Sequence, residues 1–458
     1  MNSPSPFSLS RRHFVQTMAT VALTRQVAVA APPGSSPAKT PIRVLLREAL
    51  QYENIGDVGR VPGTIRLLYQ HLPSVQVTLW PWSLHQQERV MLERNFPELR
   101  IAVGEIDDRG RSTNSDLDEA WRTSHFFLSP ARRATTYAQW AATGRPYGLF
   151  GSAFDPLTNR NSRPDGDTLE QLRQGINSVP QGALQRQYGD RTVFEKANFI
   201  FCRDSLSLQF LRQQNLQPTP LAFGPDSTFA IAVRDEKRAD DWLRRNDLAD
   251  QDFICVLPRL RYTPYYRVKN LPRSEADYTI DALNARSATS DHAPLREVIT
   301  RWVEKTGGKV IACPEMTYQI QTAKEQLVDP LPDKIKKHVV WRDVFWLPDE
   351  AASIYARARA LVSMECHSPI IALANGTPAI HIRNPVDTVK GQMFRDIGVG
   401  DWLFEVGETA GEEMWKALQI IHEDLPSARR RVQACMAQLS EVQRTMTLAI
   451  AKAVADSS

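Results

Sequence analysis

From residue 42 onward, short apolar segments alternate with longer segments whose apolar residues recur every three or four positions. This alternation limits the possible folds more than any other feature. Short apolar segments between helices are typical of strands buried on both faces of a parallel sheet. The sequence therefore predicts helices at 64–72, 116–123, 132–143, 205–214, 293–306, 317–328, 348–357 and 389–397, and strands at 42–46, 75–79, 101–103, 125–128, 147–150, 199–201, 253–257, 309–312, 338–341, 360–364 and 378–382.

The alternation occurs in two series, which predicts two α/β domains. A chain of 458 residues exceeds the roughly 250 to 300 residues that one hydrophobic core usually supports. We expect Rossmann-like domains at 42–228 and 250–405, and a helical segment at 409–456 that packs across both. Two such domains joined by a short link and spanned by a terminal helix form a GT-B-like fold. The polar stretch 152–190 is expected to be an irregular excursion outside the core.

The first thirty residues have the pattern of a twin-arginine export signal. Arg11 and Arg12 precede a weakly apolar stretch, which ends in small residues with Ala30 as the expected cleavage site. Arg25 interrupts the apolar stretch, so the alternative is a basic leader that stays attached to a cytoplasmic protein. Residues 31–41 are expected to be a flexible linker. We expect export to the periplasm or cell envelope.

Charge and composition exclude several classes of partner. The net charge is +4, but three arginines and no acidic residue lie in residues 1–30, which leaves +1 for the rest. Charge therefore gives no argument for nucleic-acid binding. No apolar stretch reaches the roughly 18 to 20 residues of a membrane span. The five cysteines have no metal-ligand spacing and no clear disulfide framework, so free thiols are expected and a bridge remains open.

The segment 363–378 places one histidine where a strand is followed by a helix. His367 lies shortly after the apolar run 360–364, and Ser368 with Pro369 indicates the start of a helix. Asn375 and Gly376 then end that helix. His367 should thus lie at the carboxyl end of a sheet strand, where free amides favour anions. The alternative is a structural histidine that only makes hydrogen bonds.

A second polar loop follows the first expected strand. It contains Asn54, Gly56 and Asp57, and together with the segment of His367 it suggests a cleft between the domains. The alternative is a simple polar turn. The glycines of this loop have the wrong spacing for a dinucleotide fingerprint, and no cofactor is expected.

Candidate cations lie in a third segment and near the end of the second domain. Arg259 and Arg261 follow the strand at 253–257, and the tyrosines around them could stack on sugar rings. This pattern suits an anionic sugar or nucleotide, although a solvated basic loop is an equal alternative. Lys390 is a further candidate near the cleft.

Several motifs in this order resemble the polysaccharide pyruvyl transferase family. They are Asn-Ile-Gly-Asp at 54–57, Cys-Arg-Asp-Ser at 202–205, Phe-Gly-Pro-Asp at 223–226 and the block 363–378. The resemblance extends from about residue 42 to about residue 405. It implies a GT-B-like fold and transfer of the enolpyruvyl part of phosphoenolpyruvate to a sugar, usually leaving a pyruvate ketal.

The resemblance also assigns residues. The family motif Ser-x-Arg-x-His places its histidine at His367 and its serine at Ser363, but its arginine position holds Glu365. This exchange reverses the charge where an anionic donor is expected. His367 would give and accept the proton, and Asp57 or Asn54 would hold or activate the sugar hydroxyl.

We therefore expect a transferase that moves a pyruvyl or related group to a cell-surface polysaccharide. His367 and Asp57 are the expected catalytic residues, and no metal is expected. The acceptor would be a polysaccharide, a sugar nucleotide or a lipid-linked sugar, with phosphoenolpyruvate as a possible donor. The alternatives are an exported carbohydrate-binding protein of this fold and a hydrolase that uses Glu365 with His367 or Asp57. The expected substrate-binding residues are Asn54, Gly56, Arg259, Arg261, Glu365 and Lys390.

Overall fold

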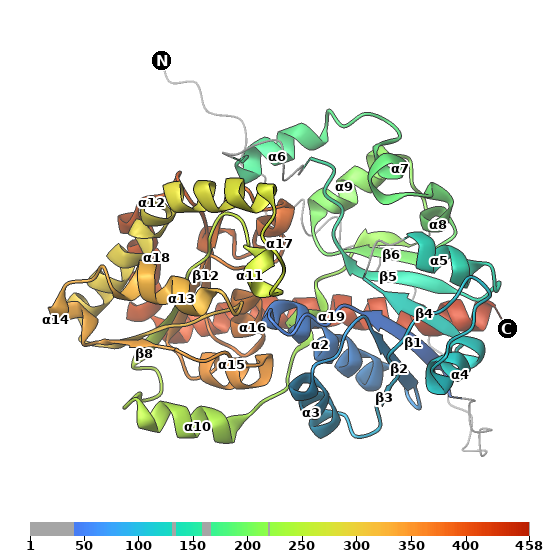
Figure 1. Cartoon of the computed structure of the whole chain (residues 1–458), viewed down its shortest axis with the longest axis horizontal. Helices are drawn as coiled ribbons and strands as arrows, with labels where there is room; N and C mark the ends of the chain where they lie inside the picture. The colour runs from blue at the N-terminus through green and yellow to red at the C-terminus, as the bar shows by residue number, and fades with distance from the viewer. Residues whose placement is uncertain (1–40, 131–133, 158–165, 219, 458) are drawn as a thin grey trace, which may run out of the picture. The chain divides into compact units, whose positions relative to one another are not determined.

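Two parallel β-sheets organise the protein (Figure 1). The computed structural model describes residues 41–457 except 131–133, 158–165 and 219. The export signal expected at 1–30, and all of the linker except its last residue, lie outside the described residues. Residues 41–458 form one compact unit.

The first sheet contains seven strands, and all neighbouring strands are parallel. They are β1 (Arg43–Glu48), β2 (Gln76–Pro81), β3 (Arg100–Ile101), β4 (Phe126–Ser129), β5 (Tyr147–Ser152), β6 (Phe199–Cys202) and β7 (Leu221–Phe223). Their spatial order is β3-β2-β1-β4-β5-β6-β7. Strands β2 and β3 therefore extend the sheet on one side of β1, and β4 to β7 extend it on the other side.

The second sheet repeats this arrangement with six parallel strands. They are β8 (Phe253–Leu257), β9 (Lys309–Ala312), β10 (Val339–Trp341), β11 (Ala360–Ser363), β12 (Ala379–Arg383) and β13 (Leu403–Glu405), in the order β10-β9-β8-β11-β12-β13. In each sheet the order in which strands are added therefore reverses beside the first strand. Open α/β sheets bind ligands at this switch point, outside the carboxyl ends of the strands.

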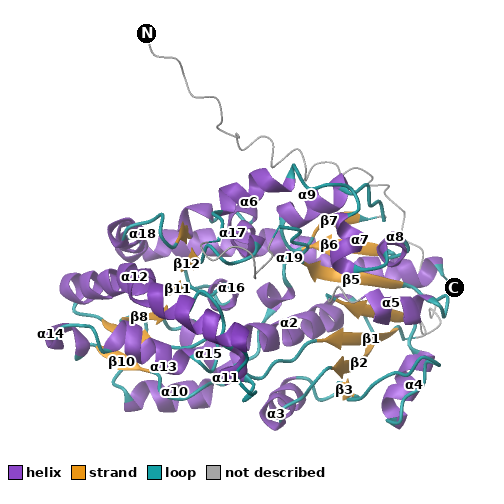
Figure 2. Cartoon of the chain, turned by 45° about the horizontal axis from the view of Figure 1, so that its top comes forward, coloured by secondary structure: helices purple, strands orange, loops and turns teal. Residues whose placement is uncertain are grey.

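Helices cover both sheets (Figure 2). In the first half they are α2 (Ile55–His71), α3 (Gln86–Asn95), α4 (Ser115–Thr123), α5 (Ala134–Ala141), α6 (Leu169–Ile176), α7 (Ala183–Tyr188), α8 (Arg191–Glu195), α9 (Ser205–Gln213) and the 3-10 turn η1 (Ser227–Ala230). Helix α10 (Glu236–Arg245) then leads to the second sheet. Among the described residues, no helix is both long enough and apolar enough to cross a bilayer.

The second half has these helices: α11 (Tyr265–Val268), α12 (Glu275–Thr306), α13 (Gln319–Ala323) with the π-turn η2 (Lys324–Val328), α14 (Asp333–Lys336), α15 (Pro348–Tyr355), α16 (His367–Ala374), the 3-10 turn η3 (Val389–Gly391), α17 (Gln392–Asp396), the 3-10 turn η4 (Gly400–Trp402), α18 (Gly411–Glu423) and α19 (Leu425–Asp456).

The strands are buried on both faces, which explains their continuous apolar sequences. In β1, Leu45 packs into one core while Val44 and Leu46 pack into another on the opposite face. A third core encloses the second sheet. Helix α19 joins two of these cores: Val432 and Leu439 lie in the core of the second sheet, and its later turns lie against the first sheet (Figure 1). The GT-B-like α/β arrangement with a long C-terminal helix is the one the sequence predicts.

Three expectations about helices are wrong. Helix α2 starts at Ile55, nine residues before the expected start, because the Asn54 side chain caps it by accepting a hydrogen bond from the Gly56 N–H at 2.9 Å. Its glycines and Pro62 obscure the helical pattern. All three glycines nevertheless lie against neighbouring segments: a Cβ atom would collide at Gly56 and Gly63, whereas at Gly59 it would fit at ordinary contact distances.

The second error concerns the stretch 152–190, which is not an irregular excursion. Within its described part, α6 and α7 place Leu169, Leu172, Ile176 and Leu184 in the core. The third concerns α12, which starts at Glu275 rather than near residue 293. The edge strands β7 and β13 were not predicted, because they have only three residues each and are half-buried.

Candidate functional site

The two predicted polar segments meet at the switch points of the two sheets. Asn54 follows β1, and His367 is the first residue of α16, which begins after a short turn at the end of β11. Figure 1 shows α2 beside α16 between the sheets. The helix of His367 begins two residues before Pro369, and Cys366 rather than Ser368 holds the capping position. As predicted, His367 lies at the carboxyl end of a central strand.

The contact between α2 and α16 is very close at one glycine. A Cβ atom on Gly56 would collide with the imidazole of His367, so only glycine fits at this position. Backbone hydrogen bonds reinforce the approach: the Ile55 N–H donates to the Glu315 carbonyl at 3.1 Å, and the Thr317 N–H donates to the Glu53 carbonyl at 3.0 Å. The start of α2 is thus fixed against the second sheet.

His367 lies between two buried carboxylates. Its Nδ1 is 3.6 Å from Glu315 Oε1, and its Nε2 is 3.8 Å from Asp226 Oδ2. Burial alone would lower the pKa of His367, but the adjacent Cys366 sulfur, Asp226 and Glu315 together hold it well above its ordinary value. The surroundings therefore favour the protonated imidazole, which can act as an acid.

The two carboxylates are themselves held in the ionised form. Burial would raise the pKa of Asp226, but His367, Arg203 and Arg60 outweigh it and lower that pKa far below the usual range. Arg203 Nη1 lies 3.2 Å from Asp226 Oδ2. For Glu315, burial is likewise outweighed by His367 and by the Ser368 N–H, which donates to Oε2 at 2.6 Å, so its pKa is lowered.

Neither carboxylate was assigned a role from the sequence. Asp226 is part of a quoted motif, and Glu315 follows β9 in the stretch before an expected helix. Both lie just after strand ends, and this position is the only signal that could have indicated them. Their meeting with His367 depends on how the two sheets face each other.

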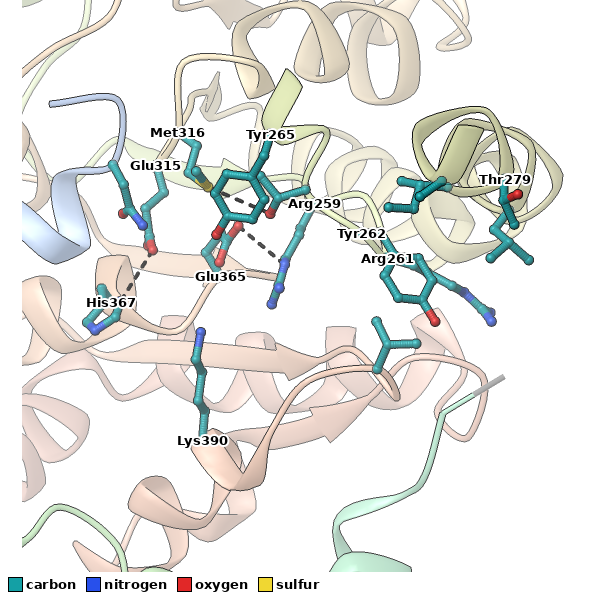
Figure 3. Close-up of a pocket in the computed structure, with 16 residues that line it drawn as sticks. Arg259, Arg261, Tyr262, Tyr265, Thr279, Glu315, Met316, Glu365, His367 and Lys390 are labelled. Carbon is teal, nitrogen blue, oxygen red and sulfur yellow. Dashed lines mark hydrogen bonds and ion pairs between the residues drawn. The ribbon is translucent and has the colours of Figure 1, made fainter. Parts of the chain in front are cut away.

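A cavity of about 460 Å³ opens beside His367 (Figure 3). It contains six of the eight predicted site residues. Its wall is formed by Asn54, Arg259, Arg261, Tyr262, Thr263, Tyr265, Ala276, Thr279, Ile280, Leu283, Glu315, Met316, Glu365, His367, Val386 and Lys390.

The other two predicted site residues lie behind the wall. Gly56 faces the His367 ring, and Asp57 accepts a hydrogen bond from Asn54 Nδ2 at 3.2 Å. Asp57 does not line the cavity, so it can orient Asn54 but does not reach a ligand there directly.

Glu365 is buried and bound by two neighbours. Gln319 Nε2 donates to Glu365 Oε1 at 2.6 Å, and Arg259 Nε lies 3.4 Å from the same oxygen. Burial raises the pKa of Glu365 to about 7, against the opposing effect of Arg259. At neutral pH a large share of this carboxyl is therefore protonated, which lessens the charge reversal relative to the family arginine.

Both arginines of the cavity are paired with aspartates. Arg259 donates to Asp387, which is almost completely buried. Arg261 binds Asp291 through two hydrogen bonds, from Nε to Oδ2 at 2.7 Å and from Nη2 to Oδ1 at 2.9 Å. The predicted basic segment is therefore not a solvated loop at these two positions.

The far side of the cavity is mainly apolar. Tyr262 and Tyr265 come from the segment around α11, and Ile280 and Leu283 come from the first turns of α12. An aromatic and aliphatic wall of this kind suits the faces of sugar rings. Among the described residues, no group of three His, Cys, Asp or Glu side chains is arranged to hold a metal ion.

The fold is shared with a solved structure at low sequence identity, and other solved structures are similar with lower scores. The UDP-bound MnaA of S. aureus matches with a TM-score of 0.51 and 8% identity, over 86% of this chain and 91% of that one. A UDP complex of Anabaena HepE matches with a TM-score of 0.48 and 9% identity, over 91% of this chain and 100% of that one. A Medicago truncatula protein complexed with UDP-glucose gives a TM-score of 0.49 at 12% identity, over 91% of this chain and 98% of that one.

A family model described as polysaccharide pyruvyl transferase matches residues 167–385. The resemblance seen in the motifs is thereby confirmed over these residues, which include Asp226, Glu315 and His367. The loop at Asn54 lies outside the matched range. No curated protein is significantly similar in sequence. The family model supports a transferase that modifies polysaccharide.

Proposed function

We propose that this chain, whose residues 167–385 match the polysaccharide pyruvyl transferases, transfers a pyruvyl or closely related group to a sugar of a cell-surface polysaccharide. The observation that carries the proposal is the position of His367, a buried imidazole that lies between two carboxylates at the wall of a cavity. The apolar and aromatic wall opposite supports a sugar as the acceptor.

The geometry gives His367 two successive roles. Transfer of a pyruvyl group needs an acid that protonates the donor and a base that accepts the proton of the attacking hydroxyl. The imidazolium of His367 supplies the first proton, and the neutral imidazole that results can then accept the second. Glu315 and Asp226 stabilise the charged form and hold the ring in place.

Asn54 and Lys390 would position the reactants. The amide of Asn54 lines the cavity, and its hydrogen bond with Asp57 fixes its orientation for a sugar hydroxyl. The ammonium of Lys390 lies on the opposite wall and suits the carboxylate of the pyruvyl group (Figure 3). Asp57 thus becomes a positioning residue rather than the base that the sequence suggested.

One observation favours a second candidate, an exported carbohydrate-binding protein without transferase activity. Glu365 and Asp387 both bind Arg259, so this guanidinium is less available to an anionic donor than the family arginine would be. The cleft would then bind glycan and perform no chemistry.

The variant His367→Ala separates the two candidates. With a panel of glycan acceptors and pyruvyl donors, we expect it to lower pyruvyl transfer by about 10²-fold or more, because it removes the proton donor. Mass spectrometry of the glycan measures the transfer, and calorimetry measures glycan affinity, which the variant should keep.

His338→Ala provides the control, because His338 precedes β10 and does not line the cavity. It should transfer as the unmodified protein does. Glycan binding without transfer by the unmodified protein, whichever donor is used, would support the binding protein and contradict the transferase.

A further inference from the structure

Four cationic side chains line the cavity: Arg259, Arg261, His367 and Lys390. Acidic groups already neutralise three of them. Arg261 is bound by both oxygens of Asp291. Arg259 is bound by Asp387 and lies against Glu365. His367 has one carboxylate near each ring nitrogen.

Lys390 differs from the other three. It belongs to the short turn η3, and its side chain is half-buried. Within the described part of the chain, its ammonium forms no hydrogen bond and no ion pair, although it lies near enough to Glu365 and Asp387 to affect them electrostatically. Figure 3 shows the ammonium pointing into the space between His367 and Arg259.

We propose that the cavity binds the pyruvyl group as a carboxylate without a phosphate, with Lys390 as the residue that binds this carboxylate. The proposal deepens the proposed function and rests on it for the identity of the pyruvyl group. Phosphoenolpyruvate would bring additional negative charges into a cavity where, of the cations that the structure describes, Lys390 alone lacks a partner. A buried charge without a partner is strongly unfavourable, so the cavity disfavours the phosphate.

A pyruvate ketal of a sugar meets this description, because it has a single carboxylate and no phosphate. Transfer from such a donor balances without any further reactant. The two bonds from the ketal carbon to the donor oxygens break, and two bonds to the acceptor hydroxyl oxygens form. The two protons of the acceptor hydroxyls pass to the released oxygens of the donor, and nothing is oxidised or reduced. His367 can give and take these protons in turn.

Calorimetry on the purified protein tests the proposal with two probes, the pyruvate ketal of a methyl hexoside and phosphoenolpyruvate. We expect the ketal to bind at least about tenfold more tightly. Lys390→Met should weaken ketal binding by about tenfold, because it removes a charged hydrogen-bond donor. The same substitution at an exposed surface lysine on α18, Lys416→Met, should leave it unchanged.

Glu365→Gln gives an independent test that leaves Lys390 in place. It removes an acidic partner of Arg259 and should bring the affinity for phosphoenolpyruvate closer to that for the ketal. The proposal is overturned if phosphoenolpyruvate binds as tightly as the ketal, if Lys390→Met changes nothing, or if neither probe binds. A different result would contradict the proposed function alone: the ketal would bind through Lys390, but no glycan would acquire a pyruvyl group.

Discussion

The two carboxylates beside His367 decide which form of the imidazole is present in the resting site. A buried histidine would normally be neutral, because burial disfavours charge. Asp226 and Glu315 reverse this preference by facing the two ring nitrogens. The resting site is therefore set up to deliver a proton first and to accept one afterwards.

Glu365 leads to a prediction about stability and pH. Burial raises its pKa from an ordinary 4.5 to about 7, so the folded protein prefers the protonated carboxyl. This contribution to stability is full below pH 4.5 and is lost as the pH rises through about 7. Relative to Glu365→Gln, which cannot ionise, the unmodified protein should lose at most about 3 kcal/mol between pH 5 and pH 8.

Denaturant unfolding of both proteins at the two pH values measures this difference. Other buried carboxyls with raised pKa values, such as Glu48 and Asp204, are present in both proteins and cancel in the comparison. If the difference in unfolding free energy does not change with pH, or if it favours the unmodified protein more at pH 8, the assignment of Glu365 is wrong.

At the scale of elements, the contact between α2 and α16 depends on one glycine. In Gly56→Ala the new methyl group would collide with the His367 ring, which must then move away from Glu315 or Asp226. We expect transfer to fall by at least about tenfold, because a small displacement of a catalytic group has a large effect on rate. The fold should survive, since alanine favours a helix over glycine by about 1 kcal/mol.

Gly59→Ala, one turn later on α2, is the matched control. Its methyl group would lie at ordinary contact distances of 3.4 to 3.6 Å from Ile231, Ile371 and Pro348. It should keep full activity with equal or higher thermal stability. Equal activities of the two variants would show that the His367 ring does not need its present position.

Individual elements also show which parts of the fold and the site could be predicted from the sequence. The strand ends carrying Asn54, Arg259 and His367 were predictable, because buried parallel strands are continuous apolar runs with clear ends. Helix α2 was predicted to start too late, because its glycines serve contacts with distant segments rather than helix propensity. The pairing of Arg261 with Asp291 was not predictable either. Asp291 lies on the part of α12 that precedes the predicted start of this helix.

At the scale of the whole molecule, we propose that residues 1–30 direct export by the twin-arginine route. The double variant Arg11→Lys, Arg12→Lys keeps the positive charge but removes the paired arginines. We expect the unmodified protein in the periplasmic fraction and the variant in the cytoplasm, as shown by immunoblotting of cell fractions. A periplasmic variant, or a cytoplasmic unmodified protein, would exclude this route.

Helix α19 constrains when the two halves of the molecule can fold during synthesis. Val432 and Leu439 complete the core of the second sheet, and Met446 and Ile450 complete a core of the first. Domains usually fold in turn as they leave the ribosome, the earlier one first. Here the first sheet lacks part of its own core until residues 425–456 have been synthesised. Neither half can therefore finish folding before α19 has been synthesised, so this helix couples the last folding step of the two halves.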